Sequence, residues 1–212
     1  MPGDLRRGAT AGRGAGTVTG HDWRRCRQVA RTGTVADALR QIRPGPAWRG
    51  RYAVVAAGPD EPAAVTDPLL AAEGLVVVRR PGGTEPPVPA AAAREVALAM
   101  AWLRLGLSER LLDDCLAYLD GRTTGGEPLI GQQLVRGELA EIRMDHLEVA
   151  AVLDDATPSN AHVLDVHRRI TGADRALLRL LGASGFVADG PGRVAYVSEL
   201  LADVYAGGYG HV

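Results

Sequence analysis

The segment from Arg94 to Asp120 contains no proline and repeats apolar residues at helical spacing, so it restricts the fold more than any other part of the chain. One stripe of this segment consists of Val96, Met100, Leu103, Leu107, Leu111 and Cys115. Leu98, Trp102 and Leu105 make the apolar face unusually wide. We therefore predict a long helix that is buried on more than one side, and we expect one of those sides to contact another subunit.

Three further segments have the same periodicity. We predict helices from about Leu129 to Asp154, from Pro158 to Leu181 with Thr157 as N-cap, and from about Arg193 to Tyr205. Their inward positions are Val135, Leu139, Ile142, Val149 and Leu153, then Val163, Val166, Ile170, Leu177 and Leu181, then Val194, Val197, Leu201 and Val204. Helices with such short connections form an antiparallel four-helix bundle, which we place at residues 90–212.

The residues before the bundle have a different character. Residues 1–20 are rich in Gly, Arg and Thr and are expected to be a disordered tail. Residues 21–89 form a small extension: one or two helical turns within His21–Ile42, ended by Pro44-Gly45-Pro46, and two short β-branched strands at Tyr52–Ala57 and Leu75–Arg80. A Pro-rich linker, residues 81–89, follows. The predicted fold is mainly α, with a small α/β N-terminal extension.

Composition excludes several classes of partner. A net charge of -1 argues against nucleic acid or an anionic membrane as the main partner, and no apolar run is long enough to span a membrane. Cys26 and Cys115 do not form a disulfide framework, so reduced thiols and a cytoplasmic location are expected. All basic side chains other than His are Arg, which rules out any mechanism that needs a lysine.

A polar turn joins the first two bundle helices. Arg122, Gly125-Gly126 and Pro128 precede Gln133, and without further context they describe an ordinary connection with a solvated arginine. The glycine-rich segment Gly182–Phe186 could approach a phosphate closely, although such segments usually only connect helices.

No metal site is predicted. His162 and His167 are five residues apart and do not share a helix face, and His146 is more typical of a satisfied core or interface histidine.

Taken together, these spacings resemble the C-terminal helical domain of the acyl-CoA dehydrogenase family, over roughly Ala91 to Gly208. That family has an Arg, then Phe-Gly three and four residues on, a Pro at six and a Gln at eleven, followed by Leu-Ala. The matching residues here are Arg122, Gly125-Gly126, Pro128, Gln133 and Leu139-Ala140, with Phe replaced by Gly. Gly182–Phe186 is similar to the family's Gly-Gly-x-Gly-Tyr/Phe loop, and Tyr205–Gly208 to its Tyr-Glu-Gly-Thr.

The resemblance implies a flavin site shared between subunits. By carry-over, Arg122 would contact the FAD pyrophosphate, with Thr124, Gln133, Gly182 and Gly185 as further cofactor contacts. The family's catalytic base, the Glu of Tyr-Glu-Gly-Thr, is replaced by Ala206, which cannot accept a proton. Some relatives carry the base on the first helix of this domain, one residue from Glu95, which makes Glu95 the candidate catalytic residue.

Three functions remain open from the sequence. The leading one is an acyl-CoA dehydrogenase-like protein of bacterial secondary metabolism that acts on an acyl thioester, as a homodimer or with a fuller partner subunit that supplies part of the FAD site. A non-redox cyclase, dehydratase or isomerase could reuse the cleft, with Glu95, Asp189, Tyr205 and His146 as candidate acid–base groups. The third is a non-catalytic dimerising subunit.

Overall fold

The computed structural model describes residues 20–42, 51–59, 63–79, 89–155 and 158–207. Several predicted features lie outside these ranges: nearly all of the N-terminal tail, the Pro44-Gly45-Pro46 run, all but the last residue of the Pro-rich linker, Thr157 and Gly208.

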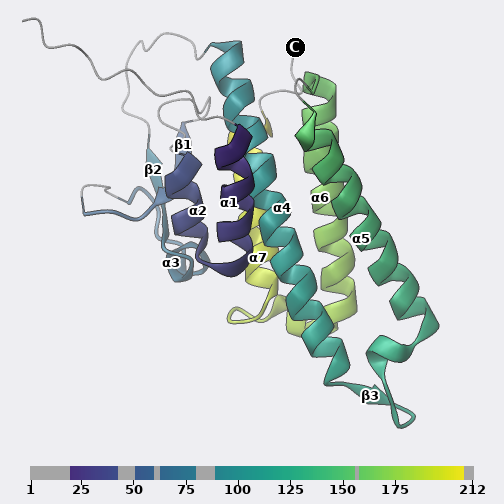
Figure 1. The fold of residues 1–212 in the computed structure, drawn as a ribbon. Coiled ribbons are helices and arrows are strands. Elements are labelled where there is room, and N and C mark those ends of the chain that lie inside the picture. Colours follow the sequence, from purple (N-terminus) through teal and green to yellow (C-terminus); the bar gives the residue numbers. More distant parts are fainter. Residues whose placement is uncertain (1–19, 43–50, 60–62, 80–88, 156–157, 208–212) are drawn as a thin grey trace, which may run out of the picture.

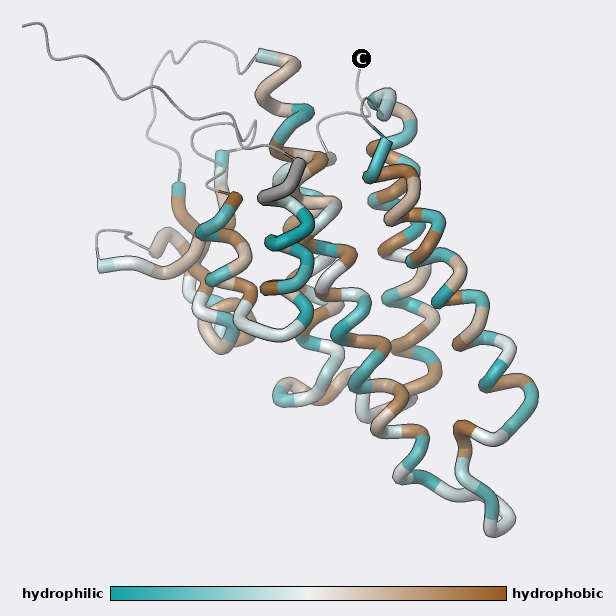
Figure 2. The backbone as a smooth tube through the Cα atoms, viewed as in Figure 1, coloured by the Kyte–Doolittle hydropathy of each residue, from teal (hydrophilic) through white to brown (hydrophobic). Residues whose placement is uncertain are grey.

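Four long helices form the bundle predicted from the sequence (Figure 1). They are α4 (Ala90–Asp120), α5 (Gln133–Asp154), α6 (Asn160–Leu181) and α7 (Gly192–Tyr205). Successive helices run in opposite directions, so the mainly α, antiparallel four-helix fold is confirmed. The hydrophobic and hydrophilic residues that gave the periodicity alternate along each helix (Figure 2).

Two predicted helix starts were wrong. Leu129–Gly131 forms a short 3-10 helix, η1, and α5 begins only at Gln133. The N-cap of α6 is Ser159, whose side chain accepts a hydrogen bond from the His162 amide, rather than Thr157. Proline at 158 suited a first helical position, but a serine one residue later offers a side-chain acceptor to the free amides of the first turn.

Helix α4 is the centre of the molecule. Every residue from 97 to 109 is buried, although the sequence pattern had placed only part of the helix surface inward. The additional side is covered by α1 (Gly20–Thr32) of the same chain. At Gly106, an added Cβ would lie 2.2 Å from the Arg27 carbonyl oxygen, so the two helices touch through backbone. The wide apolar face of α4 is therefore explained within one chain, and it is no longer a reason to expect a subunit contact there.

The N-terminal extension contains more helix than predicted. Residues 21–42 were expected to form one or two turns, but they form most of α1 together with α2 (Val35–Ile42). Both predicted strands are confirmed, and they pair with each other: β1 (Tyr52–Ala56) is antiparallel to β2 (Leu75–Arg79), and α3 (Pro68–Ala72) lies between them in sequence.

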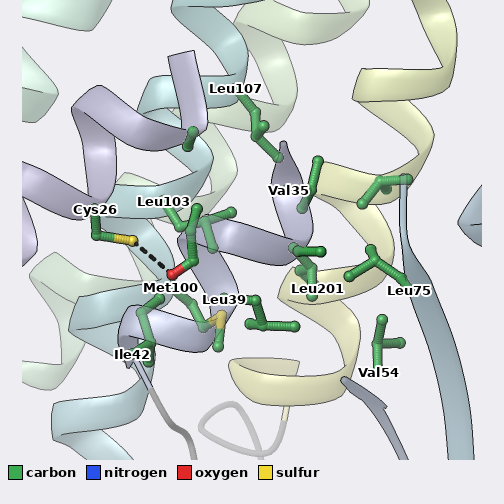
Figure 3. Close-up of a cluster of buried hydrophobic side chains, with 14 of the residues drawn as sticks. Cys26, Val35, Leu39, Ile42, Val54, Leu75, Met100, Leu103, Leu107 and Leu201 are labelled. Carbon is green, nitrogen blue, oxygen red and sulfur yellow. Dashed lines mark hydrogen bonds between the residues drawn. The ribbon is translucent and has the colours of Figure 1, made fainter. Parts of the chain in front are cut away.

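This extension shares its core with the bundle. Side chains from α1, α2 and both strands meet Met100, Leu103 and Leu107 of α4 and Leu201 of α7 (Figure 3). The Tyr205 hydroxyl on α7 donates to the Val54 carbonyl oxygen of β1 at 2.7 Å. The extension is thus packed onto α4 and α7 and has no separate core.

The connection between α4 and α5 is a small hairpin, where the sequence had suggested a simple helix–helix corner. Strand β3 (Thr123–Thr124) pairs with β4 (Glu127–Pro128), and Gly125 and Gly126 make the turn with φ of 60° and 88°. Both values lie in the left-handed region that favours glycine. Pro128 is therefore a strand residue and does not begin a helix.

None of the helices in the described ranges is both long and apolar enough to cross a membrane.

Candidate functional site

A groove of about 630 Å³ lies between α6 and the C-terminal half of α7. Its lining residues are Ala161, Leu164, His167, Arg168, Thr171, Gly172, Arg175, Ala202, Asp203, Ala206 and Gly207. Arg168, Thr171, Gly172 and Arg175 share one face of α6, because their spacing of three, one and three residues follows the helical repeat. The groove is thus built by two helices and has one predicted site position, Ala206, in its wall.

The groove carries both signs of charge. Arg168 and Arg175 are exposed cations that also pair with Asp165 (3.4 Å) and Glu199 (2.5 Å). Asp203 is an exposed carboxylate for which no hydrogen bond or ion pair to any described residue is found. Such a surface can bind an anionic group through the arginines while leaving a carboxylate free to accept a proton.

Gly172 leaves space in the groove wall. An added Cβ would meet no atom of a described residue within 4 Å, so packing among these residues does not require a glycine there. In a helix interior glycine costs about 1 kcal/mol relative to alanine. The open space next to Arg168 and Arg175 is available to a ligand.

A second, smaller cavity of about 210 Å³ adjoins the groove. It shares Thr171 and Arg175 with the groove and extends toward Gly185 and Gly192 at the start of α7. The two cavities lie next to each other along α6 and α7, and we call them together the trough.

A buried arginine donates hydrogen bonds to two of the residues that line the groove. Arg104 of α4 is fully buried and donates to Ser198 Oγ (3.0 Å), Thr171 Oγ1 (2.8 Å), and both Nδ1 and the carbonyl oxygen of His167 (2.9 and 3.1 Å). Burial lowers the pKa of the Arg104 guanidinium, and the negative charge of Asp174 opposes that shift. These bonds fix Thr171 and His167, which both line the groove.

His167 is held as a neutral ring. Its Nε2 lies 3.1 Å from the Ala97 carbonyl oxygen, which can only accept, so Nε2 carries the proton and Nδ1 accepts from Arg104. Burial, reinforced by the Arg104 charge, lowers the pKa of His167 to about 3. His167 is therefore a structural part of the groove wall and cannot serve as its base.

The polar network continues across the bundle to α5. Ser198 Oγ donates to Asp174 Oδ2 at 3.0 Å, and Ser108 Oγ lies 2.8 Å from His146 Nε2. Burial raises the pKa of Asp174 to about 6, opposed by the nearby Ser108 hydroxyl and the Arg104 charge. Burial also lowers the pKa of His146 to about 4. The sequence-based interpretation of His146 as a core histidine is consistent with its burial and its bond to Ser108.

Three of the predicted cofactor residues lie away from the trough. Arg122 is exposed at the start of the β3–β4 hairpin, with its guanidinium 4.8 Å from the centroid of the Tyr118 ring. Thr124, in the same hairpin, and Gln133, at the start of α5, are also exposed. None of the three lines either cavity of the trough.

The two predicted glycines have local structural reasons. Gly182 ends α6 with φ of 55°, a left-handed conformation. Gly185 belongs to the 3-10 helix η2 (Gly182–Phe186), and a Cβ added at Gly185 would lie 3.2 Å from atoms of Leu178 and Leu181, which is a tight contact. Gly185 nevertheless lines the smaller cavity, whereas Gly182 lines neither cavity of the trough.

Glu95 and Ala206 belong to the same end of the bundle but to different pockets. Ala206 is buried in a cluster with Leu98 and Val166 and borders the groove. Glu95 is exposed and lines a separate pocket of about 250 Å³ with Trp23, Leu98 and Leu153. The hairpin with Arg122 is at the other end of α4, whose 31 residues at about 1.5 Å each span roughly 45 Å.

Sequence reasoning missed the polar groups of the groove. Arg168, Thr171 and Arg175 recur on one face of the third bundle helix, and that pattern was available from the sequence. Asp203 precedes Ala206 by three residues, which places it on a neighbouring part of the same face of α7. These polar positions lie outside the apolar stripes that predict the fold.

In the described parts of the chain, no group of three or more His, Cys, Asp or Glu side chains is arranged to hold a metal ion. Cys26 and Cys115 are both free and buried.

The bundle with its α6–α7 groove defines an all-α domain with a partly open groove. The model of the acyl-CoA dehydrogenase C-terminal domain matches residues 91–207, which is more than half of the chain. The chain therefore belongs to the acyl-CoA dehydrogenase family through this domain. The resemblance inferred from the order of the motifs is confirmed.

Solved structures of the family match at low identity. A glutaryl-CoA dehydrogenase from Mycobacterium smegmatis in complex with FADH2 is 19% identical, with 72% of this chain and 44% of that chain covered and a TM-score of 0.47. FkbI, from biosynthesis of the methoxymalonyl extender unit of Fk520, is 19% identical, with 72% and 46% covered and a TM-score of 0.47. Butyryl-CoA dehydrogenase from Megasphaera elsdenii is 15% identical, with 74% and 48% covered and a TM-score of 0.45.

The chain thus spans less than half the length of each of these three structures. No curated protein matches the sequence.

Proposed function

We propose that this chain is an acyl-CoA dehydrogenase-like subunit that acts on an acyl thioester, or an intermediate derived from one, in bacterial secondary metabolism. The observation that supports this most is the groove beside Ala206, which combines Arg168 and Arg175 with the carboxylate of Asp203, a group that pairs with no described residue. The arginines suit the phosphate or carboxylate of an activated acyl substrate. Leu164 and the alanines of the wall suit its acyl chain.

The residues of one chain fit only part of an FAD molecule. The trough along α6 and α7 offers apolar wall, Arg175 and the Gly185 backbone, but Arg122, Thr124 and Gln133 do not line it. They could reach only a cofactor that is shared with a second polypeptide. We therefore propose a homodimer or a complex with a fuller acyl-CoA dehydrogenase-like subunit, in which bound FAD would supply the two-electron acceptor.

Asp203 is our candidate for the base that Ala206 cannot provide. It lines the same groove about one helical turn earlier, and its carboxylate would accept the proton removed from the carbon next to the thioester carbonyl. Glu95, the candidate from the sequence, lines a different pocket. A carboxylate can act as the base only if it reaches the ligand. Substitution of Asp203 and substitution of Glu95 are therefore expected to differ in their effect on proton removal.

The test is exchange of the α-hydrogens of butyryl-CoA with D₂O, followed by NMR on the full chain with its candidate partner. Loss of a positioned base typically costs 10²–10⁴-fold, so Asp203→Asn should slow exchange by at least about 100-fold while Glu95→Gln leaves it unchanged. The reverse result would assign the role to Glu95. Native mass spectrometry of the same samples, showing neither FAD nor a second subunit, together with no exchange, would contradict the dehydrogenase-like proposal.

A non-redox reaction in the same groove is the second candidate, and the replacement of the family's glutamate by Ala206 favours it. A cyclase, dehydratase or isomerase would convert its substrate in protein that is free of flavin, with Asp203 as an acid–base group alongside the earlier candidates. Turnover that is unaffected by complete removal of flavin would select this alternative.

The cytoplasmic location stays a prediction from the cysteine content.

A further inference from the structure

Thr171 of α6 lies between a buried cation and both cavities of the trough. Its Oγ1 accepts a hydrogen bond of 2.8 Å from Arg104, and its side chain belongs to the wall of each cavity. No hydrogen bond that the Thr171 hydroxyl donates to a described residue is found. The direction of the hydroxyl hydrogen therefore decides what Thr171 can bind.

The hydroxyl hydrogen of Thr171 cannot point toward Arg104. A guanidinium carries only donors, so the oxygen of Thr171 must present a lone pair to it. A threonine inside a helix often donates to the carbonyl oxygen four residues earlier, as Thr32 does to Gln28 at 3.0 Å. In α6 that acceptor is already occupied, because the His167 carbonyl oxygen accepts from Arg104 at 3.1 Å and, by the helical pattern, from the Thr171 amide. Both of its lone pairs are used, so the hydroxyl hydrogen is left to point into the trough.

Arg104 makes this hydroxyl a stronger donor than an ordinary threonine. The guanidinium is fully buried, and its hydrogen bonds to described residues go to uncharged groups of Ser198, His167 and Thr171. The carboxylate of Asp174 is joined to Arg104 only through Ser198. A hydroxyl that accepts from a cation is polarised, because hydrogen bonds in a chain strengthen one another.

Thr171 and Asp203 line the same groove from two different helices, α6 and α7. Burial lowers the pKa of Arg104, and Asp203 is close enough for its charge to oppose that shift. Next to Thr171, a Cβ added at Gly172 would meet no atom of a described residue within 4 Å. A ligand in this open space can present an acceptor to Thr171 while another of its atoms faces Asp203.

We propose that Thr171 donates its hydroxyl hydrogen to the carbonyl oxygen of the bound acyl thioester, and that Arg104 is the positioning residue that holds the hydroxyl in this direction. The inference rests on the proposed function for the identity of the ligand. When the proton of the α-carbon passes to Asp203, the C–H bond breaks, its electron pair forms a C=C bond, and the carbonyl oxygen takes up the negative charge. The hydrogen bond from Thr171 is then made to a charged oxygen, so it stabilises the enolate more than the thioester.

Acetoacetyl-CoA tests this hydrogen bond without any redox step, because its enolate absorbs in the near ultraviolet. The enolate fraction of acetoacetyl-CoA bound to the full chain is measured against pH for wild type, Thr171→Val and Thr171→Ser. Binding to wild type should increase the enolate fraction above that of free acetoacetyl-CoA. A hydrogen bond to a charged group changes an equilibrium by about tenfold or more, so Thr171→Val should lower the enolate formation constant at least about tenfold, and Thr171→Ser should keep it.

Two further variants serve as controls. Thr32→Val makes the same change at a helical threonine that lines neither cavity of the trough, so it should bind and ionise acetoacetyl-CoA as wild type does. Gly172→Leu fills the open space beside Thr171 and leaves the hydrogen bond from Arg104 in place, so it should weaken binding at least about tenfold. Circular dichroism verifies that each variant is folded.

Two results would overturn the proposal: a wild type that does not bind acetoacetyl-CoA, and an enolate fraction that is the same in Thr171→Val as in wild type. Exchange of the α-hydrogens of butyryl-CoA separates this outcome from that of the proposed function. Exchange that Thr171→Val does not slow would refute the role of Thr171 and leave the proposed function standing. An enolate that depends on Thr171, in protein that shows no exchange, would support the role of Thr171 and count against Asp203 as the base.

Discussion

Replacement of Asp174 by Asn should change the free energy of unfolding in a way that depends on pH. The free energy of the variant minus that of wild type should be higher at neutral pH than in acid. Asp174 is buried between α4 and α7, with Oδ2 bonded to Ser198 and Oδ1 without a hydrogen bond of good geometry to any described residue. A carboxylate in such a place is costly to ionise, which is why its pKa rises to about 6 from the ordinary value of 3.8. Asn has a similar shape, can accept from Ser198, and cannot ionise.

The sign follows from proton binding in the two states. Between pH 4 and pH 6 the folded protein keeps the Asp174 proton and the unfolded chain has lost it. The contribution of Asp174 to stability is therefore greatest below pH 3.8 and is lost as the pH rises through 6. A shift of about 2 pKa units corresponds to about 3 kcal/mol at 1.36 kcal/mol per unit. The Asp174→Asn variant cannot ionise at this position, so it does not lose this free energy as the pH rises.

Urea unfolding followed by circular dichroism at pH 4.5, 5.5, 6.5 and 7.5 provides the measurement. The free energy of unfolding of Asp174→Asn minus that of wild type should increase by about 2 kcal/mol across the series, since pH 4.5 to 7.5 covers about two thirds of the full effect. His146 and His167 change stability in the opposite direction with pH, because their pKa values are lowered, but they are present in both proteins and cancel in the difference.

The change of this difference with pH is the decisive quantity. A constant offset is compatible with the reasoning, since Asn also removes a negative charge near Arg104. A difference that varies by less than about 0.5 kcal/mol from pH 4.5 to 7.5 would refute the claim that ionised Asp174 is unfavourable in the fold. Asp165→Asn, an exposed aspartate on the same helix, is the control and should show no comparable trend.

Four further substitutions test the packing of the helices. Gly106→Ala should lower the free energy of unfolding in urea by at least about 2 kcal/mol, because the new Cβ would lie 2.2 Å from the Arg27 carbonyl oxygen. Gly172→Ala, in open space, should raise it by up to about 1 kcal/mol. Glu109→Ala removes a buried carboxylate that accepts hydrogen bonds of 2.7 and 2.9 Å from Arg27. The free energy of unfolding should fall by about 3 kcal/mol. A loss below about 1 kcal/mol would mean that the pair does not stabilise the α1–α4 contact. Tyr205→Phe loses the bond to the Val54 carbonyl and should lower the free energy of unfolding by about 1–2 kcal/mol, and an unchanged thermal midpoint would contradict this.

The fold of the bundle could be predicted because its signal is local. Val163, Val166 and Ile170 repeat with the helical period, and a helix with such a stripe must bury it. The predicted inward residues of all four helices are buried or partly buried, and the match to the domain model confirmed the family inferred from the order of the motifs. The ends of the helices were predicted less accurately, because residues near a cap such as Ser159 are nearly as suitable as N-caps.

The position of α1 could not be read from the sequence. Its close contact with α4 depends on Gly106 meeting the Arg27 backbone and on Glu109 meeting the Arg27 side chain. These residues are far apart in the chain, and each has an ordinary interpretation by itself. The sequence consequently assigned the second buried side of α4 to another subunit.

The candidate site shows the same division. The sequence by itself determined the four helices and the family, and it has Ala206 at the position where the resemblance predicts the usual base, since each depends on residue types at short spacings. Only the tertiary structure decided that Asp203 and Arg168, from two different helices, border the groove next to Ala206, and that Glu95 does not. Periodicity specifies which side of a helix is buried, but the side chains that face each other across two helices are determined by how those helices pack.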